Sequence, residues 1–181
     1  MTSVAIADAS CLIALHQITA LDMSSLKNRV FRLSGKNYQS GSCVKTRFLT
    51  FQSIYVPPAV MQEIRTVRPR PDWVIVQPLQ QPLSADVLRA SLGAGESQVI
   101  GLAIELTLTK RDMVVILDDL PARRLAEGLG LFVLGTLGIL MLAKRRGVIS
   151  VLRPLLDLLR NHDFRIADNL YEQVLKSSGE W

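Results

Sequence analysis

Short apolar runs alternate with helix-length segments along this chain, and that alternation is what most constrains its fold. Residues 4–8 read VAIAD and residues 113–119 read MVVILDD, so two of these runs end directly in carboxylates. Each run is followed by apolar residues at helical spacing. Strands and helices in this order favour a parallel sheet with right-handed crossovers and helices on both faces. We therefore expect an α/β fold, a three-layer α/β/α sandwich around a central, mainly parallel sheet.

The other expected elements follow from the same patterns. SIYVPP is a strand closed by proline, and Pro58 suits the first turn of a helix that RPRP at 68–71 ends. After it we expect an extended segment at 73–79, a two-turn helix at 85–92, a helix from Glu96, a strand at 113–119, a helix at 121–130, a strand at 131–135, a helix from near Thr136, and two last helices near 151–160 and 166–177.

The length of 181 residues predicts one domain spanning 1–181, with the two last helices as a C-terminal pair at about 151–177. The net charge of +5 is concentrated in one segment, because residues 23–62 contain six basic and no acidic residues. Ser, Gly and Asn cluster there without a sustained period, which predicts a basic, flexible insertion at about 23–53. Its basic residues are candidates for nucleic-acid binding, namely Lys27, Arg29, Arg32, Lys36, Lys45 and Arg47.

Two features bear on the compartment. Two cysteines cannot form a disulfide framework, and the N-terminus lacks the basic start of a secretory signal, so we expect a cytoplasmic protein. Residues 128–143 are uncharged, but sixteen residues fall short of the ~20 needed to span a membrane. Their glycines divide the run into a strand and a helix. We expect no membrane association.

Carboxylates recur at comparable points of the predicted fold. Asp8 follows the first strand, Glu63 lies in the helix after the second, Glu96 opens a central helix, and Asp118 and Asp119 end the strand expected at 113–119. Strand ends of a parallel sheet meet at one edge, where ligands bind. Crowded carboxylates repel one another and need a cation, and oxygen ligands select Mg²⁺ or Mn²⁺. Such a site supports phosphodiester hydrolysis by water activated on a metal ion.

Each acid also has a simpler interpretation. Asp8 could only cap the first helix, Glu63 could be solvated, and Glu96 could only complement a helix dipole. One aspartate before Pro121 could cap the next helix. Taken together, convergence at one rim favours a metal site, because caps have no need to converge. Ser10 could bind a carboxylate or a phosphate, or only cap the helix.

At this point the chain resembles the PIN-domain nucleases, specifically a PIN-like subgroup close to the VapC-type toxin ribonucleases of bacteria and archaea. The resemblance runs through ADASCLIAL, IYVPPAVMQEI, LGAGESQVIGLAIE, VILDDLPARRLAEGLGL and VLGTLGILMLAKRRGVI, and covers most of the chain outside 23–53. By motif, the family's four acids fall on Asp8, Glu63, Glu96 and the Asp118–Asp119 pair. The resemblance implies a Mg²⁺- or Mn²⁺-dependent endoribonuclease, a homodimer, and often a small antitoxin partner.

Three other functions stay open. The chain could be a non-catalytic nucleic-acid-binding module, using the 23–53 segment with Arg65, Arg68 and Arg70. A phosphoacceptor signalling domain would need an acid pair after the first strand, whereas the pair here follows a later one. A membrane protein built around 128–143 is the third. The complete acid set favours the nuclease.

Overall fold

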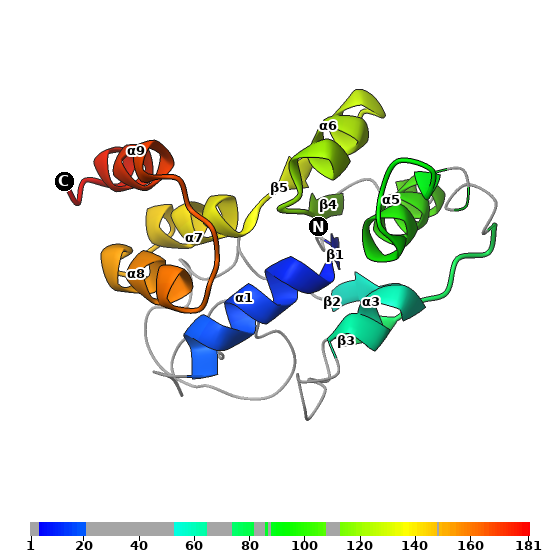
Figure 1. Ribbon diagram of the computed structural model, residues 1–181, viewed down its shortest axis with the longest axis horizontal. Coiled ribbons are helices and arrows are strands. Elements are labelled where there is room, and N and C mark those ends of the chain that lie inside the picture. The colour runs from blue at the N-terminus through cyan, green and yellow to red at the C-terminus, as the bar shows by residue number, and fades with distance from the viewer. Residues whose placement is uncertain are drawn as a thin grey trace, which may run out of the picture. The chain divides into compact units, whose positions relative to one another are not determined.

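We describe the fold from a computed structural model (Figure 1). The described residues are 4–20, 53–64, 74–81, 86, 88–107, 113–147 and 149–181. They form two compact units: one holds the strands, the first turn of the first helix and the helices that connect the strands, and the other holds the rest of the first helix and the C-terminal helices. The 23–53 segment predicted to be flexible lies outside the described residues, except for Ser53.

The first unit is built on a parallel sheet. Its strands are β1 (Val4–Ala7), β2 (Ser53–Val56), β3 (Val74–Val76), β4 (Met113–Ile116) and β5 (Val133–Leu134), in the order β3-β2-β1-β4-β5. Every strand pair is parallel, with Ile6 of β1 opposite both Tyr55 and Val115. All four residues of β1 are buried, as expected for the central strand of a covered parallel sheet. The α/β fold class with a parallel central sheet is confirmed.

Helices join these strands. The helices of the first unit are α1 (Ala9–Ala20, first turn), α3 (Pro58–Glu63), α5 (Ala94–Thr107) and α6 (Leu120–Gly128). The apolar face of α5, which includes Val99, Ile100 and Ala103, is fully buried. This helix contacts β1 and β4 of the sheet and also α3 and α6. Its N-terminus therefore lies close to the elements that follow β1, β2 and β4.

Two helix boundaries differ from those predicted. The helix α3 ends at Glu63 with Ile64 as its C-cap, although Val67 fits the same apolar spacing; residues 65–73 lie outside the described part. In the segment predicted to be helical at 85–92, residues 89–92 form a turn, in which the Leu92 N–H donates to the Leu88 carbonyl. Gly93 follows this turn, and α5 begins at the next residue, Ala94. The helix predicted at 85–92 therefore ends before residue 89.

The second unit contains the C-terminal helices α8 (Arg153–Asn161) and α9 (Asp168–Ser178), and α7 (Thr136–Arg145) except for its first residue. The Glu180 carboxylate accepts hydrogen bonds from the Lys144 ammonium and from the backbone N–H groups of Leu152 and Arg153. Burial tends to raise the pKa of Glu180, but these donors lower it overall. Glu180 thus connects the chain end to α7 and to the N-terminus of α8.

The apolar run 128–143 forms β5 and most of α7, separated at Gly135. In the part of the chain that the structure describes, we find no helix with the length and apolar character needed to cross a membrane.

Candidate active site at the ends of β1 and β4

The strand order places a topological switch point between β1 and β4. From β1 the chain moves to β2 and β3 on one side of the sheet, and then to β4 and β5 on the other. Crevices at such points, beyond the carboxyl ends of the strands, are where open α/β sheets bind ligands. Asp8 directly follows β1, and Asp118 and Asp119 follow β4. The Asp8 N–H donates to the Ile116 carbonyl at 3.1 Å, so the two strand ends are joined at this point.

Asp8 is the most buried carboxylate of the predicted set. Asp8 is 3% exposed, and its Oδ2 accepts a hydrogen bond of 2.6 Å from the Ser10 hydroxyl. Its Oδ1 is also buried but has no hydrogen-bond partner among the described residues. Leaving a buried polar atom without a partner is costly, more so when the group is charged. The arrangement is therefore one that a cation would complete.

Gly95 brings the carboxylates of Asp8 and Glu63 together. A Cβ atom placed on Gly95 would lie 3.2 Å from Asp8 Oδ1 and 3.0 Å from Glu63 Oε1. The missing side chain therefore lets both carboxylates approach the backbone of α5 at the same place. Glu63 is held there by its helix, because the Ala59 N–H of α3 donates to the Gln98 side chain of α5.

The pKa shifts show that the acids act on one another. The Glu63 residue is exposed overall, but partial loss of water around its carboxylate raises its pKa, and the charges of Asp8 and Glu96 raise it further. Burial also raises the pKa of Glu96; a backbone hydrogen bond opposes this, while Asp8 and Asp119 add to it. Nearby like charges have this effect. Asp8 thus acts on both Glu63 and Glu96, and Asp119 acts on Glu96, so the four acids share one negatively charged region of the first unit.

The two aspartates after β4 have different surroundings. Asp118 is half-buried: its Oδ1 accepts from the Thr136 N–H at 2.8 Å, and its Oδ2 accepts from the Thr136 hydroxyl at 2.6 Å and the Cys11 thiol at 3.0 Å. Asp119 is exposed and caps α6, where its Oδ1 accepts from the Ala122 N–H at 2.9 Å. Burial, together with the charge and hydrogen bond of Asp118, raises the pKa of Cys11. Asp118 thus accepts hydrogen bonds at both oxygens, whereas the structure gives Asp119 Oδ2 no donor among the described residues.

The sequence did not single out Gly95, Gly135 or Cys11, which shape this site. The glycines carried a signal, because a glycine next to an acid or after a strand allows close backbone approach. The Cys11 contact with Asp118 joins residues 107 positions apart and had no sequence signal. Ser10, predicted to contact nucleic acid or to bond a carboxylate, is exposed and bonds Asp8. The other predicted nucleic-acid-binding residues, all between Lys27 and Arg47, lie outside the described residues.

The donor set suits a hard divalent cation, because every candidate ligand is a carboxylate oxygen. Within the described residues, however, no three or more His, Cys, Asp or Glu side chains are arranged as a ready metal-binding group. The observation that favours a cation is the unpartnered Asp8 Oδ1 beside Glu63. A cation bound there would neutralise the repulsion between the two carboxylates.

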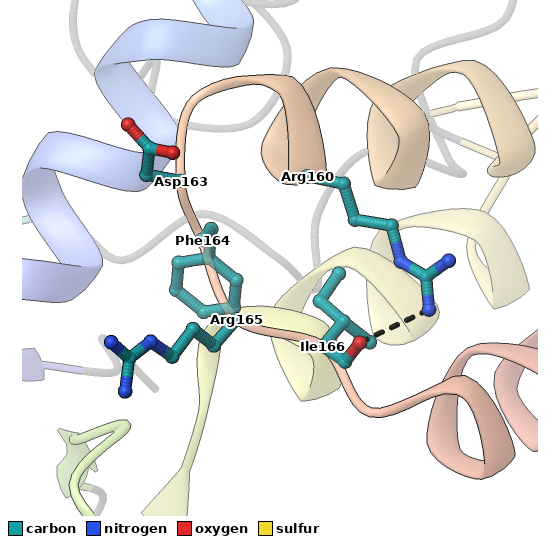
Figure 2. Close-up of a pocket in the computed structure, with 5 residues that line it drawn as sticks. All are labelled: Arg160, Asp163, Phe164, Arg165 and Ile166. Carbon is teal, nitrogen blue, oxygen red and sulfur yellow. Dashed lines mark hydrogen bonds between the residues drawn. The ribbon is translucent and has the colours of Figure 1, made fainter.

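A separate cavity of about 480 Å³ lies in the second unit. It is lined by Arg160, Asp163, Phe164, Arg165 and Ile166. Arg160 donates from Nη2 to the Ile166 carbonyl at 3.0 Å and to Asp168 at 2.9 Å, and its guanidinium lies 4.0 Å from the centre of the Tyr171 ring. The guanidinium groups of Arg160 and Arg165 point away from each other (Figure 2). Arg160 therefore stabilises the turn between α8 and α9, and the two arginines do not form a joint anion site.

The chain matches a family model described as a PIN domain over residues 45–180. The matched region contains Glu63, Glu96, Asp118 and Asp119. Asp8 precedes this region, and the pairing of β1 with β4 places it near Asp118 and Asp119. No curated protein and no solved structure matches the chain. PIN domains are generally nucleases that use divalent metals, in agreement with a cluster of acids at strand ends. The chain therefore belongs to the PIN-domain family.

Proposed function

We propose that this chain is an endoribonuclease that hydrolyses phosphodiester bonds of RNA and depends on Mg²⁺ or Mn²⁺. The observation that carries the proposal is the pairing of Asp8 and Glu63 at Gly95, where the buried Asp8 Oδ1 has no donor among the described residues. Asp8 Oδ2 accepts from the Ser10 N–H at 3.4 Å, as a helix cap does, but capping does not use Oδ1. An oxygen that faces another carboxylate instead suits a cation-binding role.

We assign the ligand role to Asp8, Glu96 and Asp119. Their charges act on one another, and Asp119 keeps one oxygen free after capping α6. Asp118 was an equal candidate from the sequence, but Thr136 and Cys11 occupy both its oxygens, so we assign it to holding the strand end in place. When bound, the divalent ion supplies an activated water and charge stabilisation for the leaving oxygen.

The chain's own residues orient the reaction. Ser10 fixes the rotation of the Asp8 carboxylate through a 2.6 Å hydrogen bond. Glu63 is exposed and lies beside the Asp8 carboxylate, so we assign it to accept the proton of the attacking water. The exposed side chains of Glu63 and Asp119 leave the rim open to a long, flexible substrate. An open rim fits single-stranded RNA better than a small molecule that needs enclosure.

The wider role follows from the resemblance to VapC-type toxins. We propose that the protein is the toxin of a toxin–antitoxin pair, acts as a cytoplasmic homodimer, and binds a small antitoxin protein. The basic segment from Lys27 to Arg47 is our candidate for additional RNA contact, because six cations without a carboxylate attract phosphate. A small gene beside this one, whose product abolishes growth arrest caused by this chain, would support the toxin role. Unimpaired growth on expression would contradict it.

The activity is tested by cleavage of mixed single-stranded RNA oligonucleotides in Mg²⁺, in Mn²⁺ and in chelator. We expect hydrolysis only with metal, and its loss in Glu96→Gln. The matched control is Glu127→Gln, which removes the same charge from an exposed position on α6. Hydrolysis that persists in chelator, or that Glu96→Gln leaves intact, would contradict the metal-dependent mechanism. Metal-independent RNA binding without hydrolysis would favour the alternative, a non-catalytic nucleic-acid-binding PIN-like module.

A further inference from the structure

Arg123 is a half-buried cation of the first unit whose charge the described protein leaves unpaired. Among the described residues, its buried Nε has no hydrogen-bond partner, and no carboxylate lies within ion-pair distance of its guanidinium. The guanidinium is always charged, with five N–H donors. Burying part of such a group without an acceptor is unfavourable. An acceptor from outside the protein would remove that cost.

The guanidinium lies at the edge of the acidic site. A Cβ atom on Gly135 would be 3.3 Å from Arg123 Nη1 and 2.8 Å from Asp118 Oδ1, so both groups border the same glycine. Arg123 is also one helical turn after Asp119, and its N–H donates to the Asp119 carbonyl. Residues four apart share one face of a helix, so Arg123 lies on the Asp119 side of α6.

Arg123 lies close to Asp118, but it is not among the groups that donate hydrogen bonds to the Asp118 carboxylate. Its two oxygens already accept from the Thr136 N–H, the Thr136 hydroxyl and the Cys11 thiol. Arg160 offers a contrast in the second unit, because its Nε is also unpartnered while its Nη2 donates to Ile166 and Asp168. Arg160 has a structural role that these contacts explain. No such contact explains Arg123.

We propose that Arg123 binds a phosphate of the nucleic-acid substrate beside the carboxylate cluster. This inference rests on the proposed nuclease function and adds a substrate-binding residue to it. A guanidinium donates two parallel hydrogen bonds to phosphate, which makes arginine well suited to this contact. An acidic rim repels a polyanion, so a cation at its edge offsets the repulsion and sets the position of the strand. The missing side chain of Gly135 lets the guanidinium approach the backbone beside Asp118.

The test measures binding of a labelled single-stranded RNA oligonucleotide, and of the DNA of the same sequence, by the full chain in chelator over a range of salt concentrations. The variants are Arg123→Gln and Arg123→Met, each checked for folding by thermal melting. The matched control is Arg124→Gln, which removes the same charge from the next, exposed position of α6. The dissociation constant should rise about tenfold for either Arg123 variant and less than about twofold for the control. The slope of log K against log salt should fall by about 0.7, the value for one phosphate contact on a single strand.

Each outcome decides the proposal. Equal weakening of RNA and DNA binding in the Arg123 variants supports a phosphate contact. Binding by a folded Arg123 variant that equals that of the Arg124 control would overturn it, and so would a loss confined to RNA, which would assign the contact to the 2′-hydroxyl. If only one variant folds, that variant decides. Failure of the wild-type chain to hydrolyse RNA would contradict the nuclease function and leave this binding result unchanged.

Discussion

Replacing Gly95 with alanine should reduce activity without unfolding the protein. The added methyl carbon would lie 3.0 and 3.3 Å from the two Glu63 oxygens and 3.2 Å from Asp8 Oδ1. These separations are shorter than ordinary van der Waals contact, so a neighbour must move by a few tenths of an ångström. Asp8 is 3% exposed and bonded to Ser10, whereas Glu63 is exposed, so Glu63 is the group that moves.

The size of the effect follows from two opposing terms. Alanine is favoured over glycine in a helix by about 1 kcal/mol, which offsets the steric cost, so the free energy of unfolding should change by less than about 1 kcal/mol. A displacement of about 1 Å in a catalytic group costs on the order of 10²-fold in rate. The smaller displacement here should lower the rate of RNA hydrolysis in Mn²⁺ by about four- to tenfold.

The assay compares initial rates and melting temperatures of wild type, Gly95→Ala and Gly128→Ala. Gly128 is the matched control, because a Cβ there meets no atom within 4 Å. A Gly95→Ala protein that melts like wild type and retains more than half of its activity would refute the role assigned to the Asp8–Glu63 approach.

Three further predictions concern stability. Thr136→Val removes the hydroxyl donor to Asp118 but keeps the shape, and should lower the free energy of unfolding by about 1–3 kcal/mol in denaturant titration; an unchanged midpoint would contradict it. Because the pKa of Glu63 is raised in the folded state, the folded protein keeps the Glu63 proton to a higher pH than the unfolded chain does. Its metal-free stability therefore falls as the pH rises above the usual Glu pKa of about 4.3. Glu63→Gln should therefore raise the melting temperature at pH 7, and a lower one would be inconsistent with repulsion. Glu180→Gln weakens the contacts to Lys144 and the α8 N-terminus and should lower the melting temperature by about 2–6 °C, an effect that disappears in acid as the wild-type carboxylate protonates.

Much of the fold was predictable because local patterns and global topology agree. The buried runs 4–7 and 113–116 are strands, and the glycine at 135 separates β5 from α7 as the composition of 128–143 indicated. The end of α3 was not predictable, because Val67 continues the apolar spacing of Val60 and Ile64 although the helix ends at Glu63. Local spacing alone does not show where tertiary contacts stop a helix.

The candidate site was predictable only as a list of acids at strand ends. The strand alternation placed Asp8 and Asp118 at one edge, since parallel strands end together. The sequence indicated that one aspartate before Pro121 could cap the next helix, which Asp119 does. It did not show which aspartate this is or what holds Asp118, because the contacts of Asp118 come from Thr136 and Cys11 of other elements. The unpaired guanidinium of Arg123 was equally hidden, because a sequence does not show which charges lack a partner.

The most direct test of the central claim is the rate of RNA hydrolysis by Asp8→Asn in Mn²⁺, measured beside wild type and the Glu127→Gln control. Asparagine keeps the size of aspartate and can still accept the Ser10 hydrogen bond, so the variant should fold normally. It removes the anionic oxygen that lies unpartnered beside Glu63. We predict a loss of about 10²–10³-fold in rate, as for other groups that stabilise charge in a transition state. Wild-type activity in a folded Asp8→Asn protein would contradict the assignment of the nuclease centre to this site.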